Sequence, residues 1–594
     1  MDHSKSIIVL DFGGQYAHLI ARRVRQCGVY SEIKDADTSA QELKNAAGII
    51  LSGGPQSVYD PNSPQGDPAI FDLGIPVLGI CYGLQWMAKA LGGEVAQGEV
   101  KEYGKAKLEM RNSKCEITSG LPEEFTVWMS HGDEAKVLPE GFEQIGTSDD
   151  CSNAFIANTS SNVYGVQFHP EVVHTQHGQE IIENFVKLCD ATPWSIKSYT
   201  DHVSEYVKQE VGDRKVFILV SGGVDSTVAF VLLNTVLGPD RVQGLYIDTG
   251  MMRKDESKEI DTAFTKLGIK NLRIEDASEY FIKKLAQVYE PEEKRWIIGD
   301  AFLSIQKRVS EEMDLKMEDG WMLGQGTIYP DTIETGETKN ADKIKTHHNR
   351  IEEIQKMMEE GLVVEPLREL YKDEVRALGE ELGLPHDLVW RHPFPGPGLG
   401  VRILCAKEKS ETRNPKLEIG VDYAALPIKS VGVQGDGRSY RHAVALFNDQ
   451  KFANEECWNL ATSIPNQSAD FNRVLMCTSH ESPPDFVFSP GYITKERAEV
   501  LRAADAIVNE EMRNAGLYET IWQFPVVLLP FGTSEGGLSV VLRPVESQEA
   551  MTASAVDLPK ETVSVMTERL LSLDRIDSVF QDLTHKPPGT IEWE

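Results

Sequence analysis

The stretch that decides the fold reads Ser221-Gly222-Gly223-Val224-Asp225-Ser226-Thr227, and it lies between two apolar runs. The run at 216–220 predicts a buried strand, and the run at 228–233 predicts a helix. Two consecutive glycines allow a ligand to approach the backbone closely and turn several N–H groups toward it. The start of a helix behind them adds a positive dipole, and three hydroxyls add donors. The stretch therefore predicts a strand, an anion-binding loop and a helix.

The loop lacks the Gly-Lys-Ser/Thr ending of the Walker type, in which a lysine reaches the terminal phosphates. It resembles the Ser-Gly-Gly-x-Asp-Ser loop of the ATP pyrophosphatases, which hold the pyrophosphate end of ATP while a substrate oxygen attacks the α-phosphate. The resemblance implies ATP as co-substrate, AMP and pyrophosphate as products, and residues 221–227 as the ATP-binding loop. A glycine and serine turn without a ligand is the alternative for this loop taken alone.

Length and composition place the chain among ordinary globular proteins. A chain of 594 residues is too long for one core and suggests three or four domains. The formal net charge of −32 disfavours nucleic acid and acidic membranes as partners, so any anionic substrate needs local donors. No stretch approaches the roughly 20 apolar residues of a membrane helix and the first residues are no signal peptide, so we expect a cytosolic protein. The eight cysteines contain no Cys-x-x-Cys pair, which argues against a zinc site and a disulfide framework.

The apolar runs predict the fold class α/β, with two successive open-sheet α/β domains and a C-terminal α+β domain. We place the first domain at residues 1–192, the second at 200–395 and the third at 396–594. In the first domain, short apolar runs each end at a glycine-containing loop, where chemistry is expected. Three prolines and three glycines at 392–400 preclude a helix or a central strand and predict a hinge or a rigid connector.

A second candidate site centres on Cys81, which lies between Gly79 and Gly83 where an apolar run meets an apolar helical segment. A sharp turn from strand to helix exposes such a side chain at the top of a sheet, and a helix N-terminus favours thiolate over thiol. A small buried core residue is the alternative reading of this cysteine.

Downstream, Val166-Gln167-Phe168-His169-Pro170-Glu171 offers a base and a group to orient it. Residues two apart in an extended segment share a face, so we expect Glu171 to orient His169, and His169 to activate Cys81. Ser52-Gly53-Gly54-Pro55 offers glycine N–H groups for an oxyanion. His-Pro-Glu alone is more often a surface turn, but three such motifs at strand ends of one α/β unit favour an active site.

These motifs closely resemble the triad-type (class I) glutamine amidotransferase domain, over about residues 7–186. The resemblance implies that Cys81 attacks the side-chain amide of glutamine, that His169 passes a proton to the departing ammonia, and that Glu171 holds His169. It implies that Gly53 and the N–H of Tyr82 stabilise the oxyanion. The loop at 129–133 also matches the family, without a role that follows from its residues.

The order of the two domains reduces the number of enzyme families that the chain can resemble. A glutaminase alone would waste glutamine, whereas an ATP-pyrophosphatase domain behind it supplies an activated acceptor for the ammonia. The combination resembles the glutamine-hydrolysing GMP synthases, whose second domain is of the adenine-nucleotide α-hydrolase type. Further matching strings lie at 324–331, 345–349, 391–400, 431–436 and 586–594. The resemblance implies that ATP adenylates XMP at its C2 oxygen, and that ammonia then gives GMP, with AMP, pyrophosphate and glutamate released.

The same resemblance assigns residues in the other two domains. Asp225 is a candidate ligand of Mg²⁺, with a helix cap as its alternative role. A mobile lid at about 325–360 contributes to adenylation, and its candidate residues are Asp331, Glu334, Lys345, His347 and His348. The residues implied for XMP are Arg295, Asp436, Gln523, Lys586 and Glu592. Lys586 would neutralise the phosphate, and Arg295 would bind it with two donors.

Several questions stay open at this point. The third domain carries added material between about His442 and Trp522 compared with short bacterial forms, whose third domain forms the dimer contact; both monomer and homodimer remain open. Ammonia crosses either through a tunnel or after rotation of the first domain about the linker near Pro193. The rival functions are an ATP-dependent RNA-modifying enzyme, which would need a basic groove, and a non-catalytic glutamine or nucleotide sensor.

Overall fold

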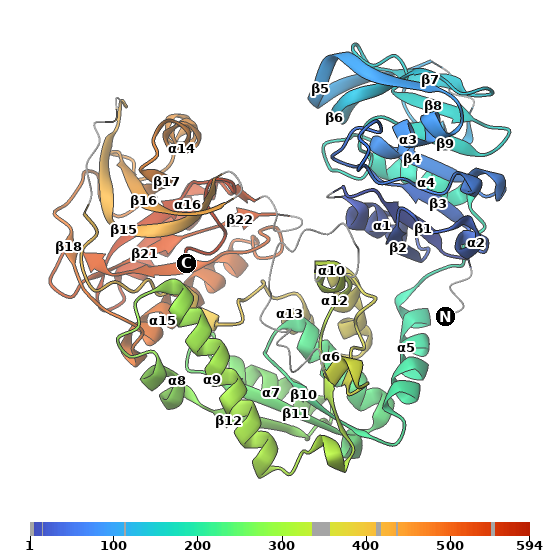
Figure 1. Ribbon diagram of the computed structural model, residues 1–594. Coiled ribbons are helices and arrows are strands. Elements are labelled where there is room, and N and C mark those ends of the chain that lie inside the picture. The colour runs from blue at the N-terminus through green and yellow to red at the C-terminus, as the bar shows by residue number, and fades with distance from the viewer. Residues whose placement is uncertain are drawn as a thin grey trace. The chain divides into compact units, whose positions relative to one another are not determined.

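The computed structural model describes residues 5–14, 16–111, 115–334, 357–411, 417, 419–434, 437–547 and 553–594 (Figure 1). By contacts the chain divides into two compact units. The first unit contains Met1–Val207, Thr327–Arg350 and Leu367–Leu378, and the second contains Lys208–Gly326, Ile351–Pro366 and Gly379–Glu594. The three domain ranges expected from the sequence stay predictions, and each unit is described by itself below.

The first unit is built on a nine-stranded sheet with the order β2-β1-β3-β4-β9-β8-β7-β5-β6. Its parallel part consists of β1 (Ile7–Asp11), β2 (Ser31–Asp35), β3 (Gly48–Leu51), β4 (Val77–Ile80) and β9 (Val163–Val166). Its antiparallel part consists of β8 (Phe155–Asn158), β7 (Glu143–Thr147), β5 (Glu94–Met110) and β6 (Glu124–Val137). The expected open α/β sheet is confirmed, with an antiparallel extension added to it.

Helices cover both faces of this sheet, which explains why its parallel strands read as unbroken apolar runs. Ile7 and Val9 join the core formed with α1 (Ala17–Gln26) and α4 (Gly178–Leu188). Ile8 and Leu10 point the other way, into the core formed with α2 (Ala40–Leu43) and α3 (Tyr82–Ala90). After the sheet, α5 (Ile196–Val211) follows the linker.

The second unit contains a parallel five-stranded sheet with the order β12-β11-β10-β13-β14. The strands are β10 (Lys215–Leu219), β11 (Val242–Asp248), β12 (Leu272–Asp276), β13 (Trp321–Gly324) and β14 (Val363–Val364). Its helices include α6 (Val224–Leu237), α7 (Glu256–Lys266), α8 (Ser278–Lys284), α9 (Pro291–Glu312) and α13 (His386–Val389). Helix α12 (Lys372–Glu381) belongs to the first unit as far as Leu378. The strand order reverses next to β10, where ligands of open α/β sheets bind.

The same unit contains a mixed six-stranded sheet with the order β15-β16-β17-β24-β21-β19. Its strands are β15 (Asp422–Gln434), β16 (Gly437–Phe447), β17 (Phe471–Cys477), β24 (Ile576–Asp582), β21 (Leu538–Leu542) and β19 (Val526–Leu529). It packs with α14 (Glu455–Gln467), α15 (Lys495–Asn514) and α16 (Lys560–Leu571). One core joins Ile298 of α9, Leu501 of α15 and Val540 of β21, so the two sheets of this unit share packing.

The proline- and glycine-rich segment at 392–400 lies inside the second unit. It ends in a short 3₁₀ turn at Gly398–Val401, and the N–H of Leu399 donates to the carbonyl of Met251 at 2.7 Å. Gly398 has a φ of +63°, and a Cβ there would lie 2.4 Å from the carbonyl oxygen of Met251. This close packing favours the rigid connector over the hinge.

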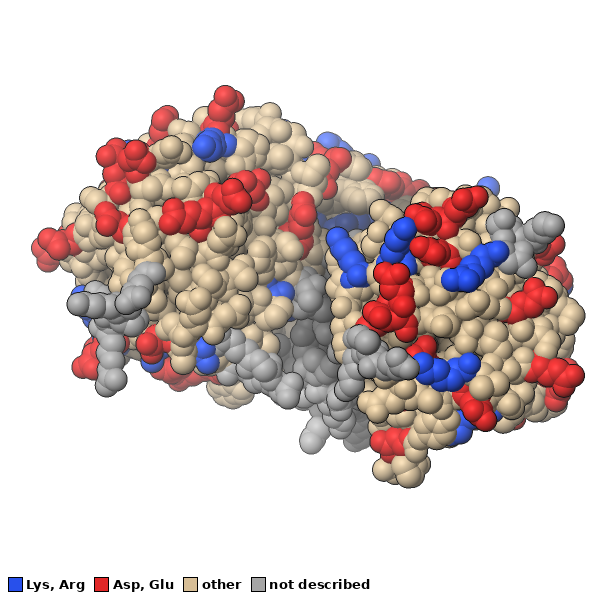
Figure 2. All heavy atoms as spheres, turned by 90° about the horizontal axis from the view of Figure 1, so that it is seen from above, with Lys and Arg blue, Asp and Glu red and all other residues tan. Residues whose placement is uncertain are grey.

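Acidic side chains are scattered over the face seen in Figure 2, with fewer basic ones among them. This surface agrees with the formal net charge of −32. Among the helices in the described ranges, none has both the length and the apolar character needed to cross a membrane.

Candidate active sites

Cys81 lies in the sharp turn between β4 and α3, as the glycines around it predict. Its backbone has a φ of 50° and a ψ of −106°, in a region that residues with a side chain rarely adopt. A Cβ at Gly83 would lie 2.3 Å from the carbonyl oxygen of Leu51, and a Cβ at Gly79 would lie 2.8 Å from the backbone nitrogen of Leu84. Only glycine fits at either position, and this packing holds the strained turn in place.

His169 and Glu171 meet behind Cys81. The Nδ1 atom of His169 lies 2.7 Å from Oε1 of Glu171, and both side chains are buried. The expectation that His-Pro-Glu is extended is wrong, because the segment forms a bend and a turn after β9. The turn is fixed where Thr175 donates to the carbonyl of His169 at 2.6 Å and Gly178 packs against the carbonyl of Pro170. The carboxylate therefore faces the imidazole through tertiary packing and not through strand geometry.

The charge state of His169 follows from its neighbours. Burial alone would lower the pKa of His169, but the carboxylate of Glu171 and the sulfur of Cys81 outweigh burial and raise this pKa well above 6.5. The Nδ1 atom of His169 interacts with Glu171, so Nε2 is the ring nitrogen that can exchange a proton with the sulfur of Cys81. The arrangement favours the protonated imidazolium form of His169.

Gly53, which is expected from the sequence to stabilise an oxyanion, lies beside Cys81 and His169. A Cβ at this position would lie 3.0 Å from Cε1 of His169 and 3.8 Å from Cβ of Cys81, so the backbone of Gly53 borders both residues. Tyr82 is the first residue of α3, so its N–H belongs to the group of free donors at a helix start. The N–H of Gly83 donates to the carbonyl of Ser52 at 3.1 Å and joins the two loops.

The structure adds two buried amides that sequence reasoning missed. Nε2 of Gln167 lies 3.7 Å from Sγ of Cys81, and Nε2 of Gln85 donates to the carbonyl of Asp133 at 2.6 Å. The thiol of Cys81 also lies 3.6 Å from the carbonyl of Ser130. A signal was available for both amides, because Gln85 follows Cys81 by one helical turn and Gln167 shares the strand-end motif with His169.

The segment at 129–133 is not the expected loop, because it lies inside strand β6, and it forms one wall of this site. His131 is buried, with Nε2 at 3.1 Å from Oε2 of Glu102 and Nδ1 at 3.1 Å from the carbonyl of Asp133. Ser148 donates to Oε1 of Glu102 at 3.0 Å. This buried network holds the carbonyls of residues 130 and 133 toward Cys81 and Gln85.

The loop at 221–227 joins β10 to α6, as expected. The hydroxyl of Ser226 closes it, since it accepts from the N–H of Ser221 at 3.1 Å and donates to the carbonyl of Gly223 at 3.2 Å. Gly222 has a φ of +80°, which favours glycine. The N-cap of α6 is Gly223, so Asp225 lies in the first turn and its alternative role as the cap is excluded.

Two further segments border this loop. A Cβ at Gly326 would lie 2.9 Å from the backbone nitrogen of Ser226, so the segment after β13 packs on the loop backbone. Oε1 of Glu256 lies 3.0 Å from a Cβ placed at Gly222, and it accepts from Nη1 of Arg391 at 3.1 Å. Burial is the largest influence on the pKa of Arg391 and lowers it, against the carboxylate of Glu256.

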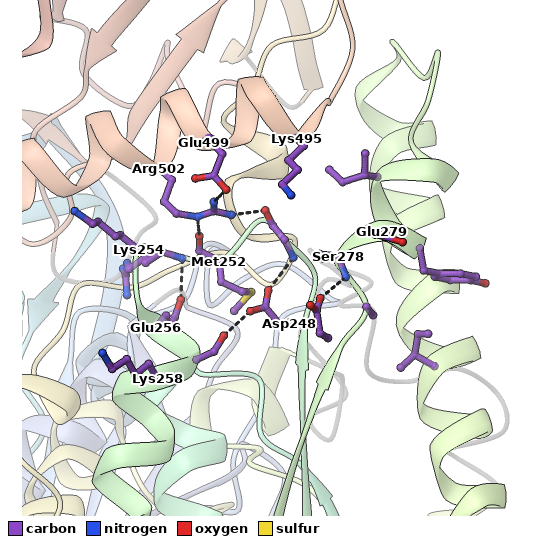
Figure 3. A pocket seen from close by; sticks show the side chains of 18 of the residues that line it. Asp248, Met252, Lys254, Glu256, Lys258, Ser278, Glu279, Lys495, Glu499 and Arg502 are labelled. Atoms are coloured by element: carbon purple, nitrogen blue, oxygen red, sulfur yellow. Dashed lines mark hydrogen bonds and ion pairs between the residues drawn. The ribbon is translucent and has the colours of Figure 1, made fainter. Parts of the chain in front are cut away.

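A pocket of about 1320 Å³ opens at the carboxyl ends of β11 and β12 (Figure 3). Glu256, which borders Gly222, also lines it, so the pocket adjoins the phosphate loop. Lys495 and Arg502 of α15 line the opposite side, and Arg502 donates to the carbonyl of Met252 at 3.0 Å. Helix α15 therefore forms part of this pocket, and it lies within the range 442–522 that is expected from the sequence to be added material.

The residues expected to bind XMP fall in different places. Gln523 donates to Oε1 of Glu592 at 3.3 Å, and Arg402 also binds this carboxylate. Arg295 donates to the backbone oxygen of Glu594. Lys586 lines a separate pocket of about 720 Å³ that also contains Arg441 and His585. Asp436 lies outside the described residues.

Of the expected lid residues, Asp331 and Glu334 lie within the described part of the chain. Asp331 lies in α10 (Tyr329–Glu334), where Oδ2 accepts from the N–H of Ile328 at 3.2 Å, and Glu334 is the last residue of this helix. Lys345, His347 and His348 lie outside the described residues. Within the described part of the chain, no group of three or more His, Cys, Asp or Glu residues is arranged to hold a metal ion.

Comparison with known proteins agrees with this architecture. Three family models match: glutamine amidotransferase class-I over residues 8–189, NAD synthase over 195–298 and GMP synthase C terminal domain over 510–593. A protein of Leptospira interrogans named "Probable GMP synthase (glutamine-hydrolyzing)" is 48% identical over 610 residues, covering 99% of each chain. The "GMP synthase (glutamine-hydrolyzing)" of Syntrophomonas wolfei is 39% identical over 605 residues, covering 100% of each chain. That of Lactobacillus acidophilus is 38% identical over 602 residues, covering 99% of this chain and 98% of its own.

The fold and the family models define a class I glutamine amidotransferase fused to an ATP pyrophosphatase-type domain. The relatives match this combination, and its C-terminal domain, over the whole chain. The chain belongs to the family of glutamine-hydrolysing GMP synthases.

Proposed function

We propose that this protein is a ligase that hydrolyses glutamine and uses the ammonia to convert XMP into GMP at the expense of ATP. The observation that carries the proposal is the placement of His169 between Glu171 and the strained nucleophile Cys81. A phosphate loop in the second unit supports the ATP-dependent half. The match to GMP synthases over the whole chain disfavours an RNA-modifying enzyme.

In the first step, the thiolate of Cys81 attacks the side-chain carbonyl carbon of glutamine. The N–H groups of Gly53 and Tyr82 receive the negative charge that develops on the oxygen. His169 then gives its Nε2 proton to the leaving nitrogen, and ammonia departs from a thioester. Water, activated by the same imidazole, hydrolyses the thioester to glutamate and restores the thiolate.

In the second step, the C2 oxygen of XMP attacks the α-phosphate of ATP, and pyrophosphate leaves. The loop at 221–227 would hold the β- and γ-phosphates through its N–H groups and hydroxyls, and the adjoining pocket has room for other parts of the nucleotide. Ammonia then adds at C2, and AMP departs as a much better leaving group than oxide. Arg295, Asp436, Gln523, Lys586 and Glu592 stay proposed contacts of XMP.

Mg²⁺ fits the donor set of this site, because the carboxylate of Asp225 lies in the first turn behind the phosphate loop. When bound, the ion would neutralise charge on the departing pyrophosphate. The lid residues Asp331, Glu334, Lys345, His347 and His348 remain candidates for adenylation. We also propose a cytosolic location, with monomer and homodimer both compatible with the chain.

The test is a coupled assay for pyrophosphate, with glutamine or an ammonium salt as nitrogen donor and a panel of purine and pyrimidine acceptor nucleotides. We expect XMP to be the preferred acceptor. Cys81→Ala should abolish glutamine-dependent synthesis while ammonium still supports it, because only the nitrogen source is lost. Cys27→Ala, a cysteine outside the site, should behave as wild type. Release of ADP and orthophosphate, or equal loss with both donors, would overturn the proposal.

A further inference from the structure

Gln167 occupies a position that the family resemblance did not assign. Its side chain is fully buried, and its Nε2 lies 3.7 Å from Sγ of Cys81. The N–H of Cys81 donates to the carbonyl of Val166 at 2.8 Å, and the N–H of Gln167 donates to that of Ala154 at 2.9 Å. Backbone bonds on both sides therefore fix the distance between amide and sulfur.

The orientation of this amide is set by a second buried amide. Nε2 of Gln85 lies 3.4 Å from Oε1 of Gln167 and 2.6 Å from the carbonyl of Asp133. The carbonyl of Asp133 accepts only, so Gln85 must present its nitrogen on this side. A reversed Gln167 would set two amide nitrogens against each other, and the unreversed amide directs its N–H toward the sulfur.

We propose that Gln167 is a catalytic residue of the glutaminase reaction, acting as a hydrogen-bond donor to the thiolate of Cys81; this assignment rests on the function proposed above. The thiol form of Cys81 can donate to the carbonyl of Ser130, at 3.6 Å, but the thiolate has no proton for that bond. The thiolate is the better acceptor for Gln167, because a hydrogen bond to an ionised group is stronger than one to a neutral group. Gln167 therefore favours the nucleophilic form and also stabilises the thiolate that leaves at the end of the cycle.

Other charged and titratable groups around the sulfur would stay unchanged in a variant of Gln167. His169 with Glu171 lies on one side, and the ring of Tyr16 packs edge-on against His169 at 5.4 Å. The wall at 129–133 contributes His131 paired with Glu102, and Asp133, whose carboxylate accepts from Ser57 at 2.5 Å. A change in the pH response of Cys81 in that variant would thus report on the amide.

The experiment measures the rate at which iodoacetamide alkylates Cys81 between pH 5 and 10, followed by mass spectrometry of the peptide that contains this residue. In Gln167→Met, which keeps the volume and removes the donor, we expect the midpoint of the pH profile to rise by about one unit. We expect kcat/KM for glutamine to fall about ten- to a hundred-fold, and ammonium-dependent synthesis to stay within about two-fold of wild type. Gln167→Glu, which places a carboxylate beside the sulfur, should raise the midpoint further.

The chain offers a matched control. Gln179 donates to Sγ of Cys27 at 3.2 Å, so Gln179→Met removes the same kind of bond at a cysteine outside the site. It should leave the Cys81 profile and both activities unchanged. An unshifted profile in folded Gln167→Met and Gln167→Glu would overturn the assignment. Alkylation of Cys81 needs no turnover. If the wild-type protein had no glutaminase activity but the variants still shifted the pH profile, Gln167 would be confirmed as a hydrogen-bond donor to Cys81 and the proposed function would be wrong.

Discussion

At the scale of single residues, the first site depends on one charge balance that the fold maintains. Glu171 is fully buried, and a turn of the backbone brings its carboxylate to His169. This carboxylate influences the charge of the imidazole. Two opposing influences act on this imidazole, and the neighbouring negative groups outweigh burial. Removing the negative charge of Glu171 therefore tests whether His169 and Glu171 act as a pair.

Glu171→Gln should lower the pKa of His169 and reduce glutamine-dependent synthesis about a hundred-fold or more, with ammonium-dependent synthesis retained. The folded pKa of His169 lies above its unfolded value near 6.5, so the protonated pair stabilises the fold fully below that value. This stabilisation disappears as the pH rises through the raised pKa. The melting temperature of the variant should therefore fall below wild type at pH 6 and approach it at high pH.

The matched control for this variant is Glu180→Gln, since His177 and Glu180 form a histidine–carboxylate pair at the surface. It should change neither the activity with glutamine nor the pH dependence of melting. A Glu171→Gln enzyme with wild-type glutamine-dependent rates would show that Glu171 does not orient the base.

In the second site, Asp225→Ala should suppress pyrophosphate release about ten-fold or more with either nitrogen donor, because the Mg²⁺ ion proposed to neutralise the departing phosphates would lose a ligand. Glutaminase activity should remain. Asp240→Ala is the control, since Asp240 lies exposed at the far end of α6. Near-normal pyrophosphate release in Asp225→Ala would remove this carboxylate from the mechanism.

At the scale of elements, the strands that carry the sites were predictable and several others were not. β4 and β10 read clearly because both faces are buried and their runs are apolar. β5 was missed although residues 105–110 alternate between charged and apolar side chains. The alternation is short, because the preceding half of the strand is rich in polar residues and glycine and its pairing with β6 shifts register between Gln97 and Glu102. The turn at 169–171 was read as extended because its shape comes from Thr175 and Gly178, outside the motif.

Gly326 tests whether the element after β13 supports the phosphate loop. A methyl group at this position would meet the backbone of Ser226 at 2.9 Å and of Asp225 at 3.0 Å, and backbone atoms cannot rotate away. Gly326→Ala should therefore displace the loop and raise the KM for ATP about ten-fold, with glutaminase activity unchanged. Steady-state kinetics of pyrophosphate release would measure the change in the KM for ATP.

The control is Gly299→Ala, in the interior of α9, where an added Cβ has no atom within 4 Å. This substitution should leave the KM for ATP unchanged and stabilise the helix by about 1 kcal/mol, visible as a higher melting temperature. If Gly326→Ala binds ATP as wild type does, the segment is a neighbour of the loop and not its support.

At the scale of the whole molecule, contacts between distant segments decide which parts fold together. Arg25 of α1 is buried, donates to the carbonyl of Ser31 at 3.0 Å and binds Glu374 at 3.1 Å. This ion pair joins Leu367–Leu378 to the first unit, although the sequence runs through the second unit in between. No local pattern predicts such a pair, because each partner alone reads as a surface charge on a helix.

The second unit has its own buried ion cluster, and it supports the last prediction. Oδ2 of Asp582 lies 2.8 Å from Nη1 of Arg473 and 3.3 Å from Nε of Arg543, and all three side chains are fully buried. Burial raises the pKa of Asp582, but the two guanidinium groups outweigh it and leave this pKa below 3.8. The cluster therefore stabilises the fold above pH 3.8 and loses this contribution only as the pH falls through the lowered pKa.

Asp582→Asn would leave two buried guanidinium groups without a carboxylate, which should destabilise the second unit by about 3–5 kcal/mol at neutral pH. Calorimetry measures the loss of stability. Residual glutaminase activity and residual pyrophosphate release after heating show in which unit the loss occurs. Pyrophosphate release should fail at a lower temperature than in wild type, while glutaminase activity, which depends on the first unit, should fail at the same temperature. Asp574→Asn, at an exposed aspartate of the same domain, should change neither. If both activities of Asp582→Asn failed together at a lower temperature, the two units would unfold as one, and the division of the chain by contacts would not describe its stability.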